Sequence, residues 1–157
     1  GETGYNSSTY YRFTTLDTEQ LKHNLGDDAQ ATSVASAFAE AFTKAIPTGH
    51  QNGFAAHSLP AAIMMVVRKG QPVSLVDAFE SPIAPKTGKS LLENALGQLD
   101  SHWEDLRKMY GDESVMFKGI VTRGQLAQQL NHLKDCEQPT VSELLKDAIA
   151  AAFPGGN

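Results

Sequence analysis

The sequence predicts an α/β (α+β) fold in which helices cover a small sheet. Candidate strands alternate with helices along the chain, and apolar residues recur every three or four positions over the predicted helix 92–110. The stretch 61–67 is apolar throughout, which is typical of a strand buried in mid-sheet with helices on both faces. A length of 157 residues, with 41% hydrophobic and 20% charged residues, predicts a single globular domain over residues 1–157.

The first third of the chain predicts one strand, two helices and a loop. Aromatic and β-branched residues fill positions 8–15, which indicates a strand. Asp17 is an N-cap for a short helix that ends before Gly26. Apolar residues repeat every four positions from about Thr32 until Pro47, where a loop rich in Gly, Pro and Asn follows over 47–53.

The rest of the chain predicts three more helices and a third strand. The helix 92–110 needs a broad apolar partner and is closed by Gly111. Shorter signals complete the pattern: a helical turn at 74–79, an irregular segment at 81–85, a strand at 115–121, a helix capped by Thr122 that carries Leu126, Leu130 and Leu133, a last helix from Thr140 to Ala152, and a frayed tail at 154–157.

The cysteine count and the start of the sequence indicate the cellular compartment in which we expect the protein. Cys136 is the only cysteine, so no internal disulfide forms, and we expect a cytoplasmic protein. No apolar run approaches the ~20 residues needed to span a bilayer, and no signal peptide is visible in the sequence. The chain starts at Gly1 without Met, which suggests a processed or truncated product.

Gly88-Lys89-Ser90 ahead of a helix resembles the end of a P-loop. The full motif needs a glycine five residues before Gly88, where this chain has Ile83. A helix cap formed by Ser or Thr is therefore favoured over a nucleotide-dependent enzyme, which stays open as an alternative.

No other residues predict catalysis, a metal or a cofactor. The five histidines lack the spacing of a zinc site and have no paired cysteines beside them. His132 and Cys136 could be taken as a nucleophile pair, but a helix end with an inert thiol is favoured.

The loop with Gly49, His50, Gln51 and Asn52 carries several side-chain donors and glycines that let a ligand approach. On these residues alone, a structural turn is favoured and ligand binding stays open.

Three segments resemble the CasC family, the guide-RNA-coating backbone subunits of type I-E CRISPR Cascade complexes. They are 46–57 (IPTGHQNGFAAH), 7–13 (SSTYYRF) and 71–80 (QPVSLVDAFE), and their order and spacing agree with the family. The resemblance is strong over about residues 1–125 and looser over 126–157. It implies a C-terminal portion of a CasC-like protein, with an incomplete ferredoxin-like (RRM-related) palm and a thumb-hairpin remnant at 1–6.

The resemblance also implies a non-catalytic role in bacterial antiviral defence. Copies would assemble head to tail along the CRISPR guide RNA, contact other Cascade subunits and meet target DNA only through the guide. It implies RNA contacts by Gly49, His50, Gln51, Asn52, Thr3 and Tyr5. His50 stands where related sequences often carry Lys.

The net charge of −5 opposes RNA binding, since RNA-binding domains cluster Lys and Arg. The resemblance would explain this if most basic contacts lie in an N-terminal part outside the chain. The alternative is a protein-interaction or scaffold domain without RNA contact. A small truncated sheet would also expose an unpaired strand edge, so dimerisation or strand exchange would be an artefact of the truncation rather than a biological property.

Overall fold

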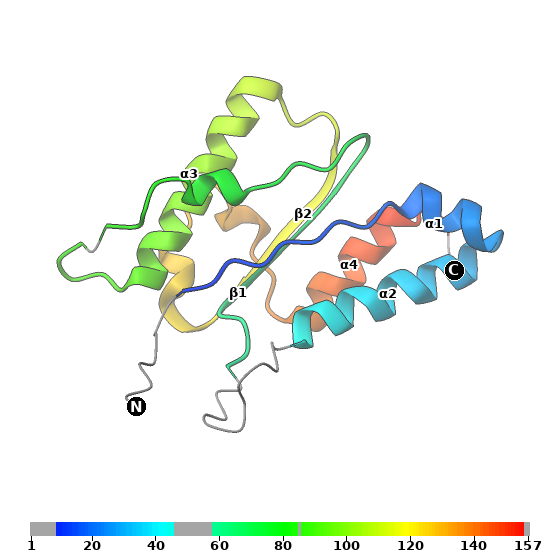
Figure 1. The fold of residues 1–157 in the computed structure, drawn as a ribbon, viewed down its shortest axis with the longest axis horizontal. Coiled ribbons are helices and arrows are strands. Elements are labelled where there is room, and N and C mark those ends of the chain that lie inside the picture. The colour runs from blue at the N-terminus through cyan, green and yellow to red at the C-terminus, as the bar shows by residue number, and fades with distance from the viewer. Residues whose placement is uncertain (1–8, 46–57, 85, 156–157) are drawn as a thin grey trace, which may run out of the picture.

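The computed structural model describes residues 9–45, 58–84 and 86–155, which form a mixed α+β fold (Figure 1). In these residues a two-stranded antiparallel sheet packs against helices. The elements are α1 (Thr18–Leu25), α2 (Asp28–Lys44), β1 (Ala62–Arg68), α3 (Leu91–Tyr110), β2 (Val115–Thr122) and α4 (Val141–Ala152), with short 3-10 helices η1 (Val76–Phe79), η2 (Gly124–Gln129) and η3 (Lys134–Cys136).

Aspartate caps fix the starts of the first two helices. The Asp17 carboxylate accepts a hydrogen bond from the Gln20 N–H, as expected for α1. Gly26 ends α1 with φ of 65°, a conformation that glycine adopts without strain. The Asp27 carboxylate then accepts hydrogen bonds from the N–H groups of Ala29 and Gln30. As a result, α2 begins at Asp28, four positions before the predicted start at Thr32.

The sheet pairs β1 with β2 in a register that runs from Ala62 opposite Thr122 to Val67 opposite Phe117. Side chains alternate between the two faces of the sheet. Met64 and Ile120 lie on the face covered by α3, and α4 packs across both strands on the other face. Helices therefore cover both faces, as the sequence predicts.

Two clusters of buried side chains hold the elements together. The larger one joins α3 to the sheet through Leu96, Leu99, Trp103, Ile120 and Leu133. The smaller one joins α1, α2 and α4, and is formed by Ala31, Ala35 and Phe153 with Leu21, Ile149 and Ala152 at its border. Small residues on α2 allow α4 to approach it closely.

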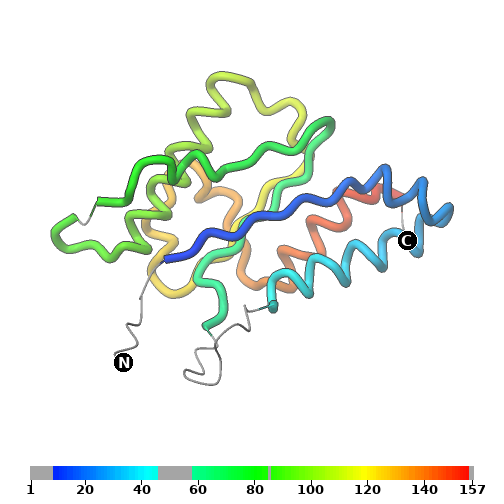
Figure 2. The backbone as a smooth tube through the Cα atoms, in the orientation of Figure 1, coloured from blue at the N-terminus to red at the C-terminus, as the bar shows by residue number. Residues whose placement is uncertain are grey.

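The strand predicted at 8–15 is wrong over its described part. Residues 9–17 form no ladder and run across the strands rather than beside them (Figure 2). The backbone there is extended but finds no neighbouring strand, and a strand requires one.

Two further predictions are wrong, one about the position of a strand in the sheet and one about a helix after Thr122. The segment 61–67 was expected in mid-sheet, but β1 has only β2 as a neighbour among the described strands and its residues are half-buried. The helix predicted after Thr122 is replaced by η2 and η3, because Gly124 takes φ of 61° and the chain turns away from β2.

Both chain ends extend beyond the described part. The predicted thumb remnant at 1–6 lies outside it, and so do residues 156–157 of the predicted frayed tail. Pro154 and Gly155, the first residues of that tail, form a turn directly after α4.

Candidate nucleic-acid interface

The residues predicted to contact RNA lie outside the described part of the chain. Gly49, His50, Gln51 and Asn52 belong to the segment 46–57, and Thr3 and Tyr5 to the segment 1–8. The structure does describe the residues on either side of these segments. Two arginines, Arg12 and Arg123, mark the two ends of the segment 46–57.

Arg12 anchors the first end. Its guanidinium donates a hydrogen bond to the carbonyl of Ala45, the last described residue before the segment. The guanidinium carbon also lies 4.5 Å from the centroid of the Phe42 ring, which gives a cation–π contact. These contacts already occupy the Arg12 side chain, so it acts as a structural tie between residues 9–17 and the end of α2.

Arg123 lies at the second end. Its backbone N–H donates to the carbonyl of Ala61 at 2.8 Å, which holds the end of β2 next to the start of β1. A shallow hollow of about 530 Å³ opens there, bounded by Ser58 and Val141. Arg123 is the single charged residue among those that line the hollow, and its side chain is exposed. An anion entering the hollow would meet a cation and no carboxylate.

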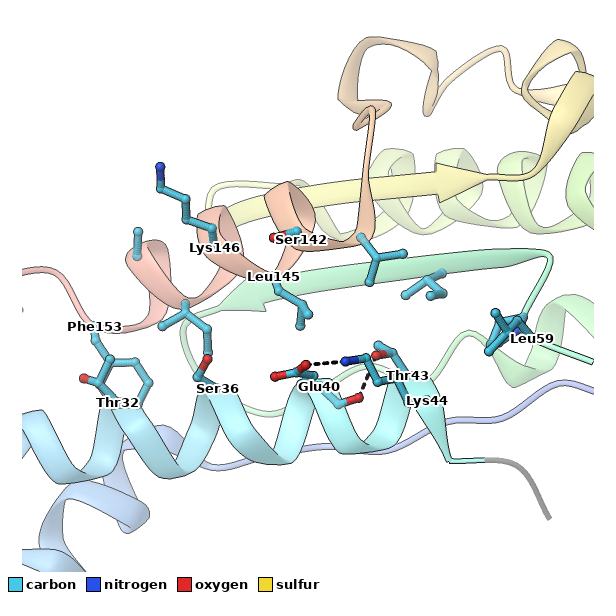
Figure 3. Close-up of a pocket in the computed structure, with 15 residues that line it drawn as sticks. Thr32, Ser36, Glu40, Thr43, Lys44, Leu59, Ser142, Leu145, Lys146 and Phe153 are labelled. Carbon is cyan, nitrogen blue, oxygen red and sulfur yellow. Dashed lines mark hydrogen bonds and ion pairs between the residues drawn. The ribbon is translucent and has the colours of Figure 1, made fainter. Parts of the chain in front are cut away.

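A larger groove of about 800 Å³ lies between α2 and α4 (Figure 3). We call it the α2–α4 groove and define it by six of its lining residues: Ser36, Glu40, Leu59, Ile63, Leu145 and Ile149. It shares Ile63 and Leu59 with the hollow beside Arg123, so the two depressions are continuous.

Two of the three charged residues that line the α2–α4 groove, Glu40 and Lys44, neutralise each other. Lys44 is bonded to the Glu40 carboxylate along α2, and this ion pair lowers the pKa of Glu40. Lys146 lines the groove, but its side chain extends away from α2 (Figure 3). The groove therefore offers apolar side chains and hydroxyls rather than a free cation for phosphate.

The P-loop-like segment is a helix cap, as the sequence favours. Ser90 Oγ accepts from the Glu93 N–H at 3.2 Å, and the Ser90 N–H donates to the Glu93 carboxylate at 2.7 Å. These hydrogen bonds lower the pKa of Glu93. Lys89 donates to the side-chain oxygen of Gln129 at 2.7 Å. The chain's own carboxylate thus occupies the helix N-terminus that a phosphate would need.

His132 and Cys136 do not pair. His132 Nδ1 lies 3.8 Å from a Glu104 carboxylate oxygen, and the Cys136 thiol donates to the carbonyl of Leu133 at 3.0 Å. Burial raises the pKa of the Cys136 thiol, which keeps it in its less reactive form. Within the described ranges, no three His, Cys, Asp or Glu side chains come together as a metal site.

Sequence reasoning missed Arg123, because its position was assigned to a helix that does not form. A charged residue directly after a predicted strand was the available signal. None of the helices in the described part is both long and apolar enough to cross a membrane.

Comparison with known proteins identifies the family. Residues 1–147 match the family model described as CT1975-like protein. Comparison with curated proteins gave no match.

Two solved structures are similar to the chain. One is a "CRISPR RNA-guided surveillance complex" chain with a TM-score of 0.73 and 29% identity, covering 88% of this chain and 51% of its own. The other, a "CRISPR RNA-guided surveillance complex, pre-nicking" chain, has a TM-score of 0.75 and 29% identity, covering 87% of this chain and 35% of its own. The chain therefore spans about half the length of the first and about a third of the second. Since the family model spans nearly all of its residues, the chain belongs to the CT1975-like protein family, which is the CasC family that the sequence resembles.

Proposed function

We propose that the chain is part of a non-catalytic backbone subunit of a CRISPR RNA-guided surveillance complex and that it binds guide RNA. One observation carries the proposal: the similarity to a chain of such a complex extends over 88% of this chain at 29% identity. Membership of the CT1975-like family over residues 1–147 supports it.

In this proposal, residues 1–157 act as one domain, and the sheet with its covering helices belongs to an incomplete ferredoxin-like (RRM-related) palm. Residues 1–6 are the remnant of a thumb hairpin. Copies associate head to tail along the guide RNA and contact other subunits of the complex. Base pairing by the guide reads the target DNA, so the protein needs to recognise only the shape and backbone of the RNA.

The RNA contacts that we propose surround the segment 46–57. Gly49, His50, Gln51 and Asn52 supply backbone and side-chain donors, and Thr3 and Tyr5 supply a hydroxyl and a stacking ring. Arg123 supplies a cation at the end of this segment. Arg123 supports the proposal because it is exposed in a hollow that no carboxylate lines, in a chain whose net charge is −5.

RNA binding at two salt concentrations tests this function. We expect the chain to bind single-stranded RNA more weakly as salt rises, because each neutralised phosphate releases counterions. Replacement of Arg123 by Gln should weaken binding to all sequences about equally and reduce the salt slope by about 1.

Lys134→Gln is the matched control, since it removes the same charge from an exposed side chain on η3. Equal effects of Arg123→Gln and Lys134→Gln would rule out a contact at Arg123. Absence of salt-dependent RNA binding both by this chain and by the full-length subunit would contradict the proposed function itself and favour a scaffold domain without RNA contact.

A further inference from the structure

We draw no further inference here: the strongest candidate, the apolar α2–α4 groove lined by Ile63, Leu145 and Ile149, is an unpartnered face, and nothing in the described part of the structure shows what covers it.

Discussion

The Asp100 carboxylate accepts a hydrogen bond from the N–H of Leu133 at 2.8 Å, although the two residues are 33 positions apart. The same carboxylate accepts from the His132 N–H at 3.0 Å and 3.1 Å. Asp100 is 1% exposed, so these backbone donors satisfy a charge that is almost completely removed from water. The middle of α3 thereby fixes the turn that follows η2.

Replacement of Asp100 by Ala should therefore destabilise the fold strongly. The change leaves two N–H groups without an acceptor, and we expect it to lower the free energy of unfolding by about 3 kcal/mol. Asp100→Asn should restore part of the loss, because its carbonyl oxygen can still accept one bond. Urea unfolding measures both. Asp105→Ala, an exposed change on the same helix, should stay within about 0.5 kcal/mol of the unaltered chain. Equal losses at positions 100 and 105 would show that the turn does not depend on the buried carboxylate.

The same contact explains one failure of sequence reasoning. Leu126, Leu130 and Leu133 have helical spacing, and from the sequence they predict a helix. In a helix, the N–H groups of residues 132 and 133 would bond to carbonyls four positions earlier. Asp100 takes them instead, and this acceptor is distant in sequence, so local spacing could not reveal it.

The four α-helices could be predicted because their signals are local. Asp17, Ser90 and Thr140 accept hydrogen bonds from residues three positions later, which the sequence displays directly. The segment 9–15 shows the opposite case, because its strand-type residues cannot specify which edge they pair with. Arg123 was missed for a related reason, since its place beside Ala61 depends on the pairing of β1 with β2.

Glu104 should make stability depend on acid pH. Hydrogen bonds from Arg107, at 2.7 Å and 2.8 Å, lower the pKa of Glu104 from 4.5 to about 2. A lowered pKa in the folded state means that the carboxylate stabilises the fold above pH 4.5 and that this contribution is lost as pH falls from about 4.5 toward 2. Thermal unfolding of Glu104→Gln should be less sensitive to pH in this window. Asp105→Asn serves as the control and should keep the pH dependence of the unaltered chain. If Glu104→Gln and the unaltered chain lost stability in parallel below pH 4.5, other carboxylates would be responsible.

Ser90 should contribute to stability and not to nucleotide binding. Ser90→Ala removes the acceptor for the Glu93 N–H, and we expect a loss of about 1 kcal/mol in the free energy of unfolding. Ser101→Ala, at an exposed position within α3, should cost much less. We expect the unaltered chain not to bind ATP, because the Glu93 carboxylate already occupies the helix start, and Lys89→Ala should not change this result. ATP binding by the unaltered chain that Lys89→Ala abolishes would reverse this interpretation.

Two glycines should respond to alanine in opposite directions. A Cβ added at Gly119 would lie 2.6 Å from Leu144 Cδ1 and 2.8 Å from Phe117 Cζ, so these side chains, or the elements that carry them, would have to shift. We expect Gly119→Ala to lower the free energy of unfolding by about 1–3 kcal/mol. Gly97 lies within α3, where nothing is within 4 Å of an added Cβ, and alanine there should raise stability by up to about 1 kcal/mol because it favours the helix. The pair is informative because both changes add the same methyl group. If urea unfolding shows that both changes stabilise the fold, the contact between β2 and α4 yields easily. If both changes destabilise it, helix propensity does not limit α3.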